Sequence, residues 1–308
     1  MPGARFFLRR LVYAAMSLAI LALTVLAFSK VGGDPVTMMI EPGASQADID
    51  ALRQRLGLDL PFWAQYLKFM KNAVTGDLGT SIYYGQSAVG LYFDRLPASL
   101  LLAGTAFAWS VLLGIGVGVT AAARPGGLID RVGAVLALIG MSMPAFWFGM
   151  LLIMFFSVHL RWLPSSGSGS WRHLVMPAIS LGWYFAASHL RLTRSAMLES
   201  LQSDYVRLAR LKGMPEWRVI LRHALPGALI PVVTLAAINF VLMVNAAVVI
   251  ETIYAWPGIG RLLYEAISFR DIPVIQAVVL MSGSMIVLLN LATDLLYVAI
   301  DPRIRHAE

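Results

Sequence analysis

Residues 204–226, DYVRLARLKGMPEWRVILRHALP, form the most charged stretch of a chain whose other long segments are mostly apolar. The pattern predicts two short helices separated by a turn. Ser203 or Asp204 can cap the first helix, because a short polar side chain satisfies the free N–H groups of an opening helical turn. Gly213 supplies the left-handed position that ends a helix, and Pro215 suits the first turn of the next one.

The first of these helices has a narrow apolar face bordered by positive charge. Tyr205, Leu208 and Ala209 follow one another at helical spacing, and the small side chain of Ala209 would allow a partner to approach closely. The surrounding basic residues are Arg207, Arg210, Lys212, Arg218 and Arg222. Such a stretch suits either an amphipathic loop lying on anionic lipid or a docking surface for another protein. The ordered spacing of Ala209, Gly213 and Leu225-Pro226 favours docking.

That spacing resembles the signature of inner-membrane permease subunits of ATP-binding-cassette importers. The family pattern is Glu-Ala-Ala, three residues, Gly, nine residues, then Ile-x-Leu-Pro. Ala209, Gly213 and Leu225-Pro226 match it. Arg207, Leu208 and His223 stand where the family has Glu, Ala and Ile. These departures are similar to the branch that imports dipeptides, oligopeptides and nickel, in which Tyr-Val-Arg-x-Ala-Arg-x-Lys-Gly replaces Glu-Ala-Ala.

The resemblance implies that residues 198–226 form a cytoplasmic coupling loop that docks onto a separate ATPase. The residues that it assigns to coupling are Asp204, Tyr205, Arg207, Leu208, Ala209, Arg210, Lys212, Gly213, Glu216, Leu225 and Pro226.

Composition places the chain in a membrane. Of its 308 residues, 58% are hydrophobic and only 13% are charged, whereas about a quarter are charged in soluble globular proteins. The absence of cysteine excludes disulfides and sulfur-ligated metals. The five histidines are scattered without ligand spacing, and no Walker-type phosphate loop is present. We therefore expect no catalytic site, no metal and no cofactor on this chain.

The apolar segments predict six transmembrane helices. The run from Leu11 to Phe28 is longer than a signal-peptide core, and no small-x-small cleavage site follows before Lys30, so we interpret it as a retained span. A bilayer needs about 20 mostly apolar residues per helix. Five further stretches meet that requirement: 99–122, 132–158, 174–190, 228–249 and 274–300.

Basic residues give the orientation, because Lys and Arg favour the cytoplasmic side. With both termini inside, 14 of the 24 basic residues lie in 59 inner positions and ten lie in 107 outer positions. The coupling loop then falls in the cytoplasm. The net charge of +7 is accordingly a sign of membrane topology rather than of nucleic-acid binding.

The chain divides into an N-terminal span (1–30), an outer helical segment (31–97), a five-helix core that includes the coupling loop (98–300) and a cytoplasmic tail (301–308). In the outer segment, Ser45 to Asp48 resembles a capping box that opens a helix through Leu56, and Gly57 ends it. Pro61 opens another helix with a broad apolar face. The resemblance extends to 33–35, 56–59, 65–67 and 76–81 of this segment, and so to nearly the whole chain.

Two groups of residues are candidates for the transport path. The fifth span carries Asn239, Met243 and Asn245, and Glu251 follows; polar residues here either join helices by hydrogen bonds or line the path. Ile253, Tyr254 and Trp256 suit a membrane interface. By resemblance, Trp256, Pro257, Gly258 and Gly260 belong to an external re-entrant element that acts as a gate. Asp294 is the one carboxylate well inside a predicted span.

The resemblance implies the permease fold of type I ATP-binding-cassette importers and a bacterial inner-membrane location. The implied partners are a second, related permease chain, two ATPase subunits that hold ATP and magnesium, and an extracytoplasmic substrate-binding protein. The implied substrates are dipeptides or oligopeptides, with nickel, glutathione or another small solute as alternatives. A self-sufficient ion-coupled carrier is the weaker alternative, because neither duplicated halves nor a set of mid-membrane ionisable residues is visible. A membrane scaffold or receptor would not need the coupling motif.

Overall fold

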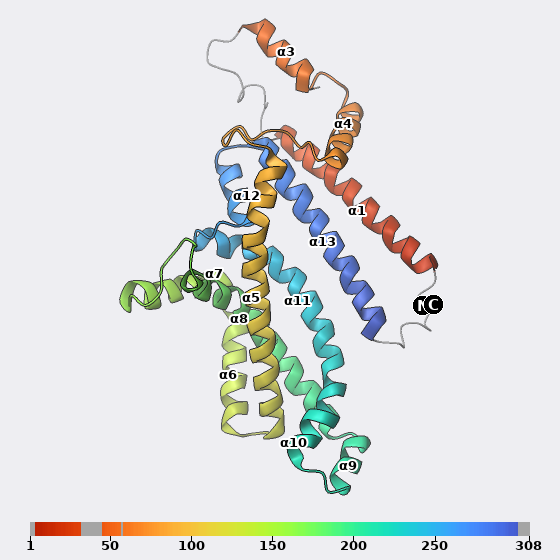
Figure 1. Cartoon of the computed structure of the whole chain (residues 1–308), viewed down its shortest axis with the longest axis vertical. Helices are drawn as coiled ribbons and strands as arrows, with labels where there is room; N and C mark the ends of the chain where they lie inside the picture. The colour runs from red at the N-terminus through yellow and green to blue at the C-terminus, as the bar shows by residue number, and fades with distance from the viewer. Residues whose placement is uncertain (1–3, 32–44, 57, 301–308) are drawn as a thin grey trace. The chain divides into compact units, whose positions relative to one another are not determined.

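A computed structural model describes residues 4–31, 45–56 and 58–300, and Figure 1 shows their helices. Between them these residues form helices, turns and one isolated bridge between Thr80 and Ser87. The helices are α1 (Ala4–Val31), α3 (Gln46–Leu56), α4 (Phe62–Thr75), α5 (Ala88–Ala123), α6 (Leu128–Ser142), α7 (Ala145–Leu152), η1 (Ile153–His159), α8 (Trp171–Leu201), α9 (Asp204–Leu211), α10 (Glu216–Arg218), η2 (Val219–Ala224), α11 (Leu225–Ile253), α12 (Ile259–Ser268) and α13 (Ile272–Ile300).

The chain forms two compact units. The first contains Met1–Pro97 and Arg261–Ala292, and the second contains Ala98–Gly260 and Thr293–Glu308. The division does not follow the predicted boundaries at 30 and 97 alone, because the segment after Gly260 returns to the N-terminal part. Long-range packing causes this return, and no local sequence signal marks it.

In the first unit, helices begin and end where the local sequence signals predict. Asp48 N donates to Ser45 Oγ at 3.3 Å and Ser45 N donates to Asp48 Oδ2 at 3.2 Å, so the capping box is confirmed. Pro61 occupies the N-cap of α4, and Gly76 ends α4 with a φ of 76°. The predicted stop at Gly57 lies outside the described residues.

A buried carboxylate joins the two sequence segments of the first unit. Asp271 is 1% exposed, and its carboxylate accepts hydrogen bonds from Ser81 Oγ and from the backbone N–H groups of Ile82 and Tyr83. Nearby, Tyr84 donates to Glu265 at 2.7 Å, and burial together with this hydrogen bond raises the pKa of Tyr84 to about 12. Residues 81–84 are thereby fixed to the turn between α12 and α13.

In the second unit, α8 packs along α11 and also contacts α6 and α7. Two glycines bring α5 against α8: a Cβ at Gly114 would overlap His189, and one at Gly118 would overlap Thr193. Such small residues allow helix backbones to approach closely within a membrane. At one end of α6, Asp130 accepts two hydrogen bonds from the Arg194 guanidinium, which ties α6 to α8.

The predicted spans agree with the structure except at two places. The helical stretches Leu8–Phe28, Ala88–Ala123, Glu216–Ile253 and Ile272–Asp294 are each long and apolar enough to cross a membrane. The predicted span 132–158 is instead two helical pieces, Leu128–Ser142 and Ala145–His159, bent by 109° at Met143 and Pro144. A proline lacks the N–H that would continue the helix, which is the physical reason for the break.

The remaining predicted span, 174–190, forms part of α8, which falls short of the apolar content of a membrane-crossing helix. Its small and polar residues Ser180, Gly182 and His189 are buried inside the second unit. Packing against other helices replaces contact with lipid for these residues. Among the described residues, four helical stretches, or five with the bent pair, are long and apolar enough to cross a membrane. A sixth crossing by α8 stays a prediction.

Candidate functional site

The coupling segment, residues 198–226, lies at the end of α8 and α11 in Figure 1. The first predicted helix is α9, and the turn after it contains Gly213 with a φ of 75°. A Cβ at Gly213 would have no heavy atom within 4 Å, so the backbone conformation alone favours glycine there. The second predicted helix is not separate, because α10 continues through η2 into α11. The coupling segment is therefore continuous with the base of α11.

The inner side of α9 is an apolar cluster. Val206 is 0% exposed and Ala209 is 4% exposed, and both pack in one cluster with Met197, Val219 and Ala224. Residues i and i+3 share a helix face, so Val206 and Ala209 turn inward together. The prediction that Ala209 shares an outward apolar face with Tyr205 and Leu208 is wrong, because α8 and η2 already cover Ala209. Its small side chain allows α9 to pack closely on its own chain.

Polar contacts fix α9 in this position. Ser200 Oγ donates to Ala224 O and lies 2.8 Å from the Tyr205 hydroxyl. Arg210 pairs with Glu216 at 2.7 Å across the turn, and this hydrogen bond raises the pKa of Arg210. Ser203 occupies the N-cap of α9, but its hydroxyl donates to Ser200 O instead of accepting from the helix.

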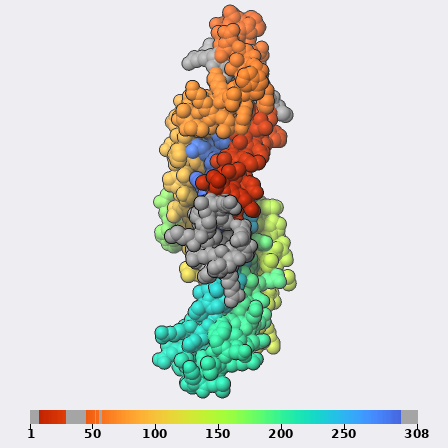
Figure 2. All heavy atoms as spheres, turned by 90° about the vertical axis from the view of Figure 1, so that its right-hand side faces the viewer, coloured from red at the N-terminus to blue at the C-terminus, as the bar shows by residue number. Residues whose placement is uncertain are grey.

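The outer side of the coupling segment exposes large apolar side chains beside basic ones. Leu208 is 53% exposed, Leu211 is 86% exposed and Trp217 is 60% exposed. Arg207 and Lys212 are exposed on the same short stretch. Figure 2 shows the atoms of the segment, green to cyan, as a continuous surface. Exposed apolar residues beside charged ones are typical of a site that contacts another protein or a membrane surface.

The four residues predicted for the path do not share one surface. Asn239 is 4% exposed, and its Nδ2 lies 3.2 Å from His189 Nε2, so it joins α11 to α8. Met243 and Glu251 are also buried inside the second unit. Asn245 is exposed and donates to Val241 O of its own helix at 3.0 Å.

A different face of α11 is exposed within the described part of the second unit. Ile238, Leu242 and Val249 are 45%, 50% and 51% exposed. Together with Thr234 and Asn245 they follow one another every three or four residues, which places them on one helix face. This exposed face of α11 runs along most of the helix and includes two polar side chains in an otherwise apolar stripe.

The candidate gate is packed into the second unit. Trp256 is 4% exposed and its Nε1 donates to Ala98 O at 2.9 Å. Tyr254 is 1% exposed and its hydroxyl donates to Gly149 O at 2.9 Å. Internal hydrogen bonds thus satisfy the polar groups of Tyr254 and Trp256, and their position at a membrane interface stays a prediction. Pro257, Gly258 and Gly260 complete the turn that follows.

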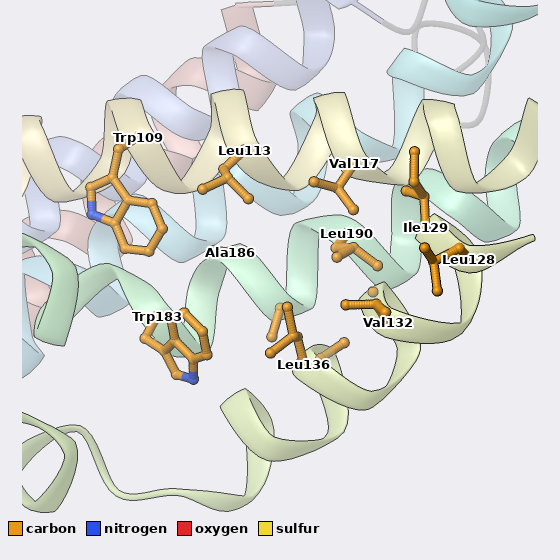
Figure 3. A pocket seen from close by; sticks show the side chains of 13 residues that line it. Trp109, Leu113, Val117, Leu128, Ile129, Val132, Leu136, Trp183, Ala186 and Leu190 are labelled. Carbon is orange, nitrogen blue, oxygen red and sulfur yellow. The ribbon is translucent and has the colours of Figure 1, made fainter.

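The second unit also contains an apolar pocket of about 360 Å³ between α5, α6 and α8 (Figure 3). Trp109, Leu113, Val132, Leu136 and Trp183 are among its lining residues, and none of the lining side chains is charged. A polar solute would lose its hydrogen bonds to water there without replacement. The pocket is therefore unsuited to a charged or peptide-like substrate.

Sequence reasoning missed the polar residues that act across long sequence distances. Ser200 is one of them, and Ser99, whose hydroxyl donates to Glu251, is another. A single serine in an apolar or mixed helix carries no local signal of its partner. Among the described residues no cluster of three or more His, Asp or Glu could hold a metal. Asp294, on α13, is half-buried.

The sequence of the chain is similar to those of known membrane transport proteins. The family model described as "Binding-protein-dependent transport system inner membrane component" matches residues 114–306, and the model of the N-terminal part of such components matches residues 3–103. A protein of Pectobacterium atrosepticum named "Glutathione transport system permease protein GsiC" is 40% identical over 302 residues, which cover 98% of this chain and 99% of the relative. Its counterpart of the same name in Escherichia coli (strain K12) is 39% identical over 302 residues.

Solved structures show the same fold at low identity. The MetNI methionine ABC transporter in an inward-facing conformation gives a TM-score of 0.54 at 20% identity, covering 68% of this chain and 96% of the other. An amino acid ABC transporter gives a TM-score of 0.54 at 14% identity, covering 68% of this chain and 93% of the other.

Proposed function

This chain belongs to the family of binding-protein-dependent transport system inner membrane components, and on that premise we propose that its coupling segment docks onto a separate ATPase and drives the import of a short peptide such as glutathione. The chain is a permease subunit of an ATP-binding-cassette importer in the bacterial inner membrane. ATP is hydrolysed by separate subunits of such an importer.

The docking proposal rests on the difference between the two sides of α9, one buried and one exposed. Its inner side packs on α8 and η2 through the buried side chains of Val206 and Ala209, which fixes the orientation of α9 on its own chain. Its outer side presents Leu208 and Leu211 to a partner. The runner-up interpretation, a basic loop on anionic lipid, uses the same charges but does not need this fixed orientation.

Transmission follows from the continuity of the chain after Gly213. When ATP draws the two ATPase subunits together, α9 moves with them as a lever. The turn at Gly213 and the Arg210–Glu216 pair pass this movement to α10, η2 and the base of α11. The spans then reorient and open the path toward a loaded binding protein, which is alternating access.

A second permease chain completes the path in this proposal. The exposed face of α11 is the surface on which it would pack or which would line the space between the two chains. Thr234 and Asn245 supply the polar groups on that face. Asn239, Met243 and Glu251 support it from within the unit.

Short peptides, glutathione included, are the substrate class that we propose. The relatives at 39–40% identity are named for glutathione transport, and the coupling motif is similar to the peptide and nickel branch. The test is uptake by proteoliposomes that contain both permease chains, the ATPase subunits and the binding protein. Labelled glutathione, a dipeptide and nickel are offered separately. ATP-dependent accumulation of nickel alone would reject the proposed substrate class.

A further inference from the structure

A buried carboxylate joins three segments at the end of α11 opposite the coupling segment. Glu251 is 1% exposed; its Oε1 accepts a hydrogen bond from Ser99 Oγ at 2.5 Å and its Oε2 accepts one from Gly260 N at 2.7 Å. Ser99 Oγ in turn accepts a hydrogen bond from Ile259 N at 2.8 Å. The carboxylate and the hydroxyl together satisfy two N–H groups at the start of α12, where a helix favours negative charge.

The turn between α11 and α12 is shaped to this carboxylate. We define residues 254–260 as the outer turn. A Cβ at Gly258 would overlap the Glu251 carboxylate, and a Cβ at Gly260 would overlap Val248. Trp256 adds its hydrogen bond to Ala98 O. The outer turn is thus held by Glu251 on one side and by the segment around Ser99 on the other.

The same helix connects this site to the coupling segment. α11 runs from Leu225 to Ile253 as one continuous helix. Glu251 lies 26 residues beyond Leu225, which at a rise of 1.5 Å per residue is about 39 Å. Although α11 contains Pro231, it stays one continuous helix, so we expect a movement at its base to reach its far end.

We infer that Glu251 is the positioning residue that makes the outer turn move with α11, so that ATPase action at the coupling segment opens or closes the external mouth. This inference rests on the proposed function and deepens it by naming the element that receives the movement. Without the carboxylate, α11 would still move, but the outer turn would no longer follow.

Three variants separate this role from simple support of the fold. Glu251→Ala removes both acceptors, and Ser99→Ala removes one link. Glu251→Gln keeps an acceptor for Gly260 N and can donate to Ser99 Oγ after its hydroxyl rotates. The matched control is Thr252→Ala, because the Thr252 hydroxyl donates only to Val248 O of its own helix in the structure.

The absence of cysteine allows the movement to be measured directly. Ala255→Cys reports on the outer turn, where residue 255 is half-buried. Leu211→Cys reports on docking, since Leu211 is 86% exposed. The full importer is reconstituted in proteoliposomes, and the rate of maleimide labelling at each cysteine is compared with and without ATP and loaded binding protein.

Coupled sites typically influence each other by about 5- to 150-fold, so we expect ATP to change labelling at residue 255 by about fivefold or more in the native background and in Thr252→Ala. In Glu251→Ala we expect ATP to change labelling at residue 255 by less than about twofold. The change in Ser99→Ala and in Glu251→Gln should lie between these two values. Residue 211 should remain protected by the ATPase in every variant.

The outcomes distinguish the role of Glu251 from docking of the coupling segment onto the ATPase. Protection at residue 211 together with full ATP-dependent labelling at residue 255 in both Glu251→Ala and Ser99→Ala would overturn the role of Glu251. Absence of protection at residue 211 in the native background would instead reject docking itself. If Glu251→Ala fails to assemble, Ser99→Ala and Glu251→Gln decide: native-like ATP dependence in both overturns the inference.

Discussion

Gly213 offers the sharpest test of docking, because its requirement for glycine is separable from packing. Its φ is 75°, and an added Cβ would meet nothing within 4 Å. The cost of a side chain is therefore the backbone strain alone, about 1–2 kcal/mol for an ordinary L-residue. If the docked form of the coupling segment needs this turn, Gly213→Val should weaken binding of the ATPase by about 5- to 30-fold.

The control is Gly213→Asn, because asparagine tolerates the left-handed conformation better than valine. Binding of the purified ATPase subunits to permease pairs in nanodiscs gives the dissociation constant of each variant. Membrane insertion should be unchanged in both, since the turn lies outside the apolar spans. Val and Asn variants with equal affinity, or a Val variant within about twofold of the native chain, would refute the reasoning from backbone strain.

Three further results are expected. Asn239→Ala removes the contact with His189 and should lower stability in detergent by about 0.6 kcal/mol, the average for a hydrogen bond within a membrane protein; an unchanged denaturation midpoint would contradict the joining role. Asn245→Ala should leave that midpoint unchanged and alter the rate of uptake, because the Asn245 amide donates to Val241 O of its own helix; unaltered uptake would remove it from the path. A reporter after Arg303 should be cytoplasmic and one inserted near Gln54 should be external, as judged by enzyme fusions, and finding both on one side would reject the proposed topology.

Signals that act within one or two helical turns were sufficient for prediction. The capping box at Ser45, the start and stop of α4 at Pro61 and Gly76, and the positive φ at Gly213 all depend on nearby residues. The long charged stretch likewise predicted the short helix α9 and the turn that follows it. These features are chemically fixed by residue type and spacing.

Features that depend on distant partners were beyond sequence reasoning. Ala209 fits either side of α9 by spacing, and only the covering by α8 and η2 decides that it turns inward. Glu251 was expected on the path, whereas its carboxylate is occupied by Ser99 and Gly260 N. A periodicity argument cannot show which of two suitable faces meets another helix, because that choice is made by the whole packed unit.

The 109° bend between α6 and the α7–η1 piece also bears on how this part of the chain fits a bilayer. α6 has 15 residues, which span about 22 Å, whereas the hydrocarbon layer of a bilayer is about 30 Å thick. A short apolar segment is accommodated by local thinning of the bilayer, at a fraction of a kcal/mol per ångström of mismatch. We therefore expect acyl-chain length to act on this side of the protein, because shorter lipids match the length of α6 more closely.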